Sequence, residues 1–200
     1  MNPKEILKST QIFIKNQFSG ETTGHDYYHI QRVVKTARKI ASEENADLFL
    51  VKLAAWLHDV GDYKLHDGMD KSEELISEFL FELNLPKETI SKIIEIVSQV
   101  SFSKGNAPTS LEAKIVQDAD RLDALGAIGL ARTFAYGGSK QREIYNPENP
   151  EETSIQHFYD KLLKLKDLMN TDSARKIAAK RHLFLEEFLN RFYEEWEGEN

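Results

Sequence analysis

Three segments of this 200-residue chain carry histidines and aspartates in an arrangement that suits a divalent metal ion. His29 comes first, the adjacent pair His58 and Asp59 follows at the end of an apolar stretch, and Asp120 lies downstream. Imidazole nitrogens and carboxylate oxygens are the donors that borderline divalent metals prefer. A His-Asp pair among Leu, Ala and Trp is costly to bury unless a cation compensates its charge. These four residues are therefore candidate metal ligands.

Each candidate also has an ordinary structural explanation. A lone histidine beside the apolar face of a helix, as His29 is, more often forms a hydrogen bond in the core than a bond to metal. His58 ends a helical pattern, with Gly61 suited to the C-terminal cap, so it can instead interact with the helix dipole. Asp118 competes with Asp120 as the last ligand. The residue types alone leave these alternatives open.

Helices must position these residues, because apolar residues recur at intervals of three and four along almost the whole chain. Strand patterns are nearly absent, so the predicted fold class is all-α. In the helix that carries His29, Asp26 suits the N-cap. The buried stripe predicted for that helix consists of Ile30, Val33, Val34, Ala37, Ile40 and Ala41. The pattern predicts helices over approximately residues 3–18, 26–44, 47–59, 70–83, 86–101, 111–134, 154–169 and 171–196.

A long stretch without regular periodicity, residues 136–152, precedes the last two predicted helices. A connection of this length is typical of a lid, a binding loop or a disordered segment. Gly137 and Gly138 would let it move over a substrate. Because neither a repeat nor a linker interrupts the chain, we predict one domain over residues 1–200. Its motif-bearing core spans about 20–135, and its closing helices span about 154–197.

Composition excludes several classes of function. The net charge of −7 and the pI near 5.4 disfavour contact with a nucleic-acid backbone, which needs clustered Lys and Arg. The chain has no cysteine, which excludes disulfides and thiolate sites. No apolar run approaches the roughly 20 residues of a membrane span, and the charged N-terminal segment lacks a signal-peptide core. We expect a cytoplasmic protein that binds neither nucleic acid nor membranes.

The segments around the four candidate ligands resemble the HD-domain superfamily of metal-dependent phosphohydrolases, whose pattern is H…HD…D on a helical bundle. The resemblance covers about residues 20–190 and is carried by GHDYYHIQRV at 24–33, AWLHDVGD at 55–62 and VQDADRLDALG at 116–126. It looks most like the compact stand-alone bacterial subgroup that includes nucleotide pyrophosphohydrolases. It implies a single HD-type helical bundle that binds metal through His29, His58, Asp59 and Asp120. In the pattern of the superfamily an alanine directly precedes the last aspartate, which favours Asp120, preceded by Ala119, over Asp118.

The resemblance also bears on the number of ions. Two-metal HD phosphodiesterases bring additional histidines between the HD pair and the last aspartate, whereas this chain has only His66 there. We therefore expect one strongly held divalent ion (Mn, Mg, Fe, Co or Ni, with Mn favoured). A weaker second ion shared with substrate phosphates is compatible with this pattern. The oligomeric state stays open, a homodimer included.

The expected nucleophile is water on the metal, because the chain shows no Ser-His-Asp set, cysteine or P-loop. Asp59 or Asp62 is the candidate proton acceptor, with Asp118 as a further option. His25 is a candidate acid or phosphate contact, and an exposed loop histidine is the alternative. Asp123, one turn after Asp120, is a candidate partner that orients a neighbouring group.

The candidate substrate contacts are polar and aromatic residues outside the metal set, each with a surface or core role as its alternative. Arg32 and Lys64 suit phosphates near the first two motifs, and His157 and Lys161, four residues apart, suit the same cleft. Tyr136 or Phe158 is the candidate ring for stacking on a base.

The resemblance implies a phosphohydrolase that acts on a small phosphorylated molecule, and we expect a nucleotide. The specific prediction is a nucleoside triphosphate pyrophosphohydrolase. A nucleoside monophosphate phosphatase is the near alternative. A helical sensor module that binds metal or nucleotide without turnover is the alternative of a different class, and the intact four-residue set weighs against it.

Overall fold

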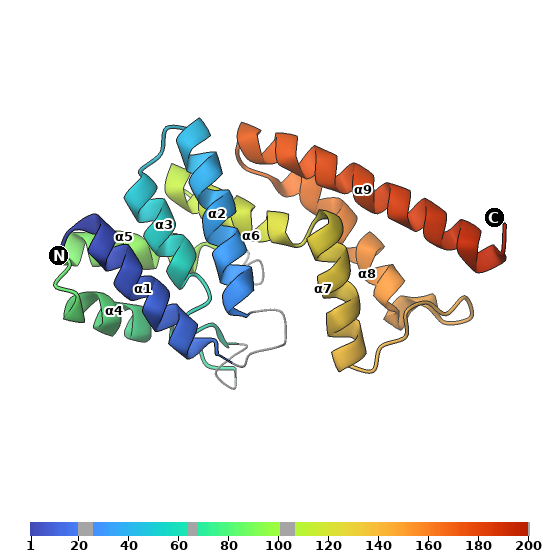
Figure 1. The fold of residues 1–200 in the computed structure, drawn as a ribbon, viewed down its shortest axis with the longest axis horizontal. Helices are drawn as coiled ribbons and strands as arrows, with labels where there is room; N and C mark the ends of the chain where they lie inside the picture. Colours follow the sequence, from blue (N-terminus) through green and yellow to red (C-terminus); the bar gives the residue numbers. More distant parts are fainter. Residues whose placement is uncertain (20–25, 64–67, 101–106, 200) are drawn as a thin grey trace. The chain divides into compact units, whose positions relative to one another are not determined.

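The computed structural model describes residues 1–19, 26–63, 68–100 and 107–199. Within these ranges the chain is helical and forms no strand (Figure 1), which confirms the all-α prediction. None of the described helices combines the length and the apolar composition that crossing a membrane requires. The chain divides into two compact units, Met1–Asp120 and Arg121–Asn200, so the single-domain interpretation stays a prediction.

The first unit is built around a nearly continuous apolar helix. Its helices are α1 (Pro3–Gln17), α2 (Tyr27–Glu43), α3 (Leu48–Leu57), α4 (Ser72–Glu82), α5 (Lys87–Ser98) and most of α6 (Leu111–Asp123). α3 packs against α1, α2 and α5, while α4 packs on α5 (Figure 1). Because three helices enclose α3, all residues from Leu53 to Leu57 are buried. The HD pair therefore follows directly at the end of the core helix.

Side-chain caps set the starts of α2 and α3. Asp26 Oδ1 accepts a 2.6 Å hydrogen bond from the His29 backbone N–H, which confirms Asp26 as an N-cap. Asp47 Oδ1 caps α3 in the same way, and its own N–H donates to Glu112 Oε1 on α6 at 3.2 Å. The predicted apolar stripe of α2 is buried at every position. Because α2 packs against α3 and both His29 and the last turn of α3 are buried, the first turn of α2 and the end of α3 belong to one core.

The turn after the HD pair has no room for a side chain at Gly61. This residue has a φ of +72°, and a Cβ built there would lie 2.5 Å from the Lys71 carbonyl carbon and 2.5 Å from the Ser72 nitrogen. The Lys71 N–H donates to the Gly61 carbonyl at 2.9 Å. The start of α4 thus packs backbone against backbone on the HD turn. Gly68 has a φ of +85°, but among the described residues no atom lies within 4 Å of a Cβ built there.

The second unit contains α7 (Gly126–Ser139), α8 (Ser154–Asp160), α9 (Asp172–Glu197) and the short 3-10 helices Pro150–Glu152 and Leu162–Leu168. α9 packs against α7 and Leu162–Leu168, and α8 contacts α7 (Figure 1). Aromatic rings make up much of its core. Phe158 is buried there, and a chain of ring contacts runs outward from it through the half-buried Phe134, Phe188 and Phe192 to the exposed Trp196.

Two predicted helices differ from the structure. The helix predicted over 111–134 is broken, because α6 ends at Asp123 and α7 begins at Gly126, whose φ of +71° is left-handed. The apolar pattern continues across this break and so conceals it. The helix predicted over 154–169 ends as α8 at Asp160, and a 3-10 helix follows.

The two glycines of the predicted mobile stretch lie inside α7, which runs through Tyr136 to Ser139. A Cβ on Gly137 would lie 2.3 Å from Ser154 Oγ, so glycine allows α7 to approach the start of α8. Beyond α7 the chain is tied down, since the Ser154 N–H donates to the Glu143 carbonyl at 2.9 Å. The Tyr145 ring packs edge-on against Trp196 at 4.9 Å. Loop movement through these glycines is therefore a wrong prediction, and packing against the start of α8 explains Gly137.

Candidate metal centre

His29, His58 and Asp120 each offer one ligand atom, and these three atoms lie within 4.8 Å of one another. Asp120 Oδ1 is 3.4 Å from His29 Nε2 and 3.8 Å from His58 Nε2. Donors bound to one ion at about 2.1 Å lie roughly 3.0–3.4 Å apart. The cluster therefore needs only a small contraction to hold a divalent metal ion. Its residues come from α2, the end of α3 and α6, all within the first unit.

The carboxylate of Asp59 faces the same two histidines. Its Oδ2 atom lies 3.5 Å from His29 Nε2 and 3.5 Å from His58 Nε2. Asp59 is 6% exposed, close to the 1% of His29 and the 7% of His58. The core helix thus delivers a buried carboxylate to the cluster, and its role as a fourth ligand stays a prediction.

A hydrogen bond to the backbone determines which nitrogen of His58 can bind metal. Its Nδ1 lies 2.9 Å from the Ala55 carbonyl oxygen, which can only accept, so Nδ1 carries the proton. Nε2 then presents a lone pair toward the cluster, as in many metal-binding histidines. Among the described residues, buried His58 Nε2 has no hydrogen-bond partner. Because a buried polar atom without a partner is costly, a metal bond at Nε2 fits this structure.

The electrostatic environment keeps Asp120 ionised. Burial opposes ionisation, and Asp59 acts in the same direction. The close approach of His29, whose Nε2 lies 3.4 Å from Asp120 Oδ1, and the attraction of His58 outweigh both effects, so the pKa of Asp120 lies below its ordinary value. An ionised carboxylate beside two imidazoles is a suitable donor set for a divalent cation.

The other candidates in the first unit lie close in sequence to the cluster. Asp62 is half-buried, and its N–H donates to the Asp59 carbonyl at 3.3 Å. Arg32 is half-buried one turn after His29 on α2. Asp118 is fully buried on α6, and the compact cluster contains Asp120 rather than Asp118. The predictions for His25 and Lys64, and the isolated histidine at 66, lie outside the described residues.

Three predicted substrate contacts, Tyr136, His157 and Lys161, belong to the second unit. Tyr136 is 44% exposed, and the Nζ of Lys140 lies 5.8 Å from its ring centroid. His157 lines a polar pocket of about 470 Å³ together with Lys140 and Arg142. Burial, and then the positive charges of Lys161 and Arg142, lower the pKa of His157. The roles of these residues in substrate binding stay predictions.

Two further side chains in this unit are engaged in packing or pairing. Phe158 is completely buried and its ring stacks 5.6 Å from that of Phe188, so it cannot receive a base, and that prediction is wrong. Asp123 Oδ2 accepts a 2.8 Å hydrogen bond from Arg132 Nη1.

Sequence reasoning missed the steric role of Gly61, although its place directly after the HD turn was an available signal.

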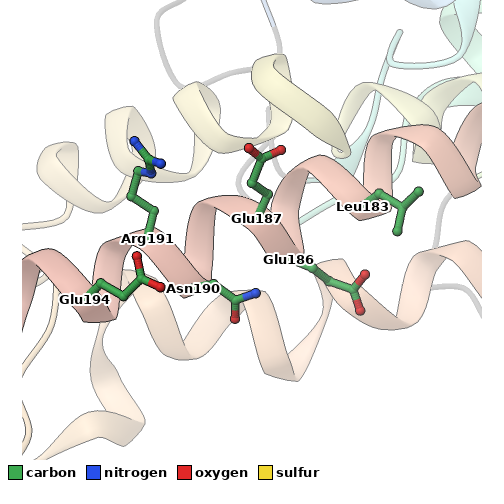
Figure 2. Close-up of a pocket in the computed structure, with 6 residues that line it drawn as sticks. All are labelled: Leu183, Glu186, Glu187, Asn190, Arg191 and Glu194. Carbon is green, nitrogen blue, oxygen red and sulfur yellow. The ribbon is translucent and has the colours of Figure 1, made fainter. Parts of the chain in front are cut away.

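A separate pocket of about 390 Å³ runs along α9 (Figure 2). It is lined by Leu183, Glu186, Glu187, Asn190, Arg191 and Glu194. Its lining has no imidazole, unlike the cluster in the first unit. Acidic side chains on an exposed helix face are usually solvated, so we assign no role to this pocket.

Known proteins resemble this chain along nearly its full length. YpgQ of Bacillus subtilis (strain 168), described as uncharacterized, is 39% identical over 201 residues, covering 98% of this chain and 97% of its own. The structure of an HD-superfamily hydrolase from Bacillus thuringiensis has 42% identity and a TM-score of 0.85, covering 98% of this chain and all of its own. A structure of B. subtilis YpgQ in complex with ADP has 37% identity, a TM-score of 0.85, and coverage of 98% and 97%.

The family model for the HD domain matches residues 26–125, which span α2 to the end of α6. All four candidate ligands fall inside this match. The aligned structures also share the helical architecture of this chain over nearly its whole length. Sequence, fold and the geometry of the cluster agree, and the chain belongs to the HD domain family.

Proposed function

We propose that this protein is a metal-dependent phosphohydrolase that acts on nucleotides and releases pyrophosphate from nucleoside triphosphates. The observation that carries the proposal is the cluster of His29, His58 and Asp120, with Asp59 facing both imidazoles at 3.5 Å. The complex of the relative YpgQ with ADP supports a nucleotide as the ligand. The net charge of −7 favours small polyphosphates over long nucleic-acid strands.

One ion, preferably Mn²⁺, is proposed to bind His29, His58, Asp59 and Asp120. Four protein donors would leave room at such an ion for water and substrate. When bound, such an ion polarises a phosphoryl oxygen and lowers the pKa of water. The two carboxylates of the set balance its double positive charge, which accounts for acidic residues at the end of an apolar helix.

The protein groups around this set supply proton transfer and positive charge. Asp62, three residues after Asp59, is the proposed acceptor of a proton from the attacking water. Arg32 brings a permanent charge one turn after His29 and suits a phosphate of the substrate. The remaining proposed contacts are those predicted from sequence: His25, Lys64, Tyr136, His157 and Lys161. Cytoplasmic location likewise stays a prediction.

Metal binding should stabilise the protein measurably. Mn²⁺ added to chelated protein at 100 times its Kd contributes about 2.7 kcal/mol, which raises the Tm of a chain of this size by roughly 5–10 °C. Elemental analysis should find about one ion per chain. His58→Ala should lose most of this thermal shift, whereas His182→Gln in α9 should keep it. A full shift in His58→Ala would place the ion elsewhere.

A substrate panel tests the proposed reaction. Full-length protein loaded with Mn²⁺ is incubated with ribo- and deoxynucleoside triphosphates, nucleoside monophosphates and single-stranded oligonucleotides, and ³¹P NMR identifies the products. We expect pyrophosphate and monophosphate from triphosphates, with oligonucleotides left intact. Phosphate released mainly from monophosphates would indicate a phosphatase instead. Nucleotide binding without any turnover would indicate a sensor module, and faster cleavage of oligonucleotides would contradict the substrate class.

A further inference from the structure

The helix that carries Asp120 runs on into the second unit. Asp120 is the last residue of the first unit, and α6 continues through Arg121 and Leu122 to Asp123. In an α-helix each N–H bonds to the carbonyl four residues earlier, so Leu122 and Asp123 help to hold the turn that contains Asp120. Both Leu122 and Asp123 are buried. What binds these two residues therefore bears on the position of a candidate metal ligand.

Arg181 of α9 caps the end of α6. Its Nη1 donates a hydrogen bond to the Leu122 carbonyl, which also accepts from the Leu125 N–H at 3.1 Å. The side chain passes Gly126, where an added Cβ would lie 3.1 Å from Arg181 Cγ. Glycine therefore serves two purposes at the helix break, since it accepts a φ of +71° and leaves space for the arginine. A cation at the carboxyl end of a helix also interacts favourably with the helix dipole.

An ion pair with a residue of another helix holds Asp123. Arg132 of α7 donates from Nη1 to Asp123 Oδ2 at 2.8 Å and to the Asp123 carbonyl at 3.4 Å. Asp123 is 5% exposed, so salt and water screen the pair little. Burial lowers the pKa of Arg181, and the charge of Asp123 acts in the opposite direction, which indicates that this carboxylate also attracts Arg181. Arg181, Asp123 and Arg132 thus form a connected set, here called the α6 cap.

We propose that the α6 cap positions Asp120 in the metal cluster, with Arg181 and Asp123 as positioning residues. The inference rests on the metal site of the proposed function, because it assumes that Asp120 binds the ion. Asp120 Oδ1 lies 3.4 Å and 3.8 Å from the two imidazole Nε2 atoms. Metal ligands must be held within about 0.5 Å of the productive geometry, so a small shift of the end of α6 would weaken the site. Val116 and Ala119 are completely buried on α6 and also anchor it, so the loss should be partial.

Metal affinity tests this role directly. The Kd of Mn²⁺ is measured by calorimetry on chelated, full-length protein, and Tm is measured in parallel. Arg181→Ala and Asp123→Asn should each raise the Kd by about 2- to 30-fold, as residues that influence a site without contacting its ligand do. Arg181→Lys keeps a cation at the end of α6 and should recover most of the affinity. Lys180→Ala removes an exposed neighbouring cation and should match the parent.

A second control separates positioning from general stability. Leu189→Ala opens a cavity in α9, two turns beyond Arg181, and should lower Tm at least as much as Arg181→Ala does. It should leave the Kd of Mn²⁺ unchanged, because it does not touch the α6 cap. An equal rise in Kd for Leu189→Ala and Arg181→Ala would mean that stability alone is measured, and it would overturn the inference. An unchanged Kd in Arg181→Ala would overturn it as well.

A double-mutant cycle shows whether Arg181 acts through Asp120. Zn²⁺ is used here, because it binds nitrogen and oxygen donors more tightly than Mn²⁺ and so measures weakened sites. Arg181→Ala should raise the Kd of Zn²⁺ in the parent but not in Asp120→Ala. The same rise in both backgrounds would contradict the inference. If the parent binds metal but hydrolyses no nucleotide, the proposed reaction fails, while the expected pattern of Kd values would still support the positioning role. A parent that binds no metal would overturn both proposals.

Discussion

Asp59→Ala should lower nucleotide turnover by more than about 100-fold, because even the outer partners of metal ligands typically contribute 10- to 100-fold. The Asp59 carboxylate is buried at the end of α3 and lies 3.5 Å from both imidazole Nε2 atoms. In the proposed metal site, its removal would delete one donor and one of the two negative charges that would balance the ion. Initial rates with Mn²⁺ and a nucleoside triphosphate measure the effect.

Matched variants separate loss of chemistry from loss of structure. Asp59→Asn keeps the shape of the side chain but removes its charge, so it should lose turnover nearly as completely. Glu78→Ala removes an exposed carboxylate from α4 and should retain full activity. Far-UV circular dichroism of metal-free Asp59→Ala should match the parent, since no apolar core residue changes. Residual turnover above about one tenth would show that the chemistry lies elsewhere.

Gly61→Ala should lower the free energy of unfolding by about 3 kcal/mol or more, because two penalties combine at this position. A left-handed φ of +72° is unfavourable for alanine, and its Cβ would lie 2.5 Å from backbone atoms of Lys71 and Ser72. Backbone atoms cannot move aside as the end of a flexible side chain can. Denaturant unfolding should show the loss, with a fall in Tm of roughly 6–12 °C.

Gly68→Ala is the matched control for this prediction. Its φ of +85° carries the same conformational penalty, but no atom of the described residues lies within 4 Å of the added Cβ. It should therefore cost only about 1 kcal/mol. Because Gly61 directly follows the HD turn, Gly61→Ala should also weaken Mn²⁺ binding about 10- to 100-fold, by displacing His58 and Asp59. Equal destabilisation by the two alanines would refute the steric argument.

Sequence alone determined the helical class and the candidate ligands of the metal centre. Helical periodicity is a local property, so the stripe from Ile30 to Ala41 predicted the buried face of α2. The donor types of His29, His58 and Asp120 were equally visible, because metal preference depends on side-chain chemistry. Their common location followed from the resemblance to a known pattern, since spacing along the chain does not by itself bring three helices together.

Only the tertiary structure decided how these residues are held and which neighbours are available. The Nε2 of His58 faces the cluster because its Nδ1 bonds to the Ala55 carbonyl, a contact that depends on the path of the backbone. The sequence likewise did not reveal the helix break at Gly126 or the burial of Phe158, because both depend on the path of the backbone. An apolar pattern reports that a face is buried, but it does not report what packs there or where a glycine turns left-handed. Those features arise from contacts between residues far apart in sequence.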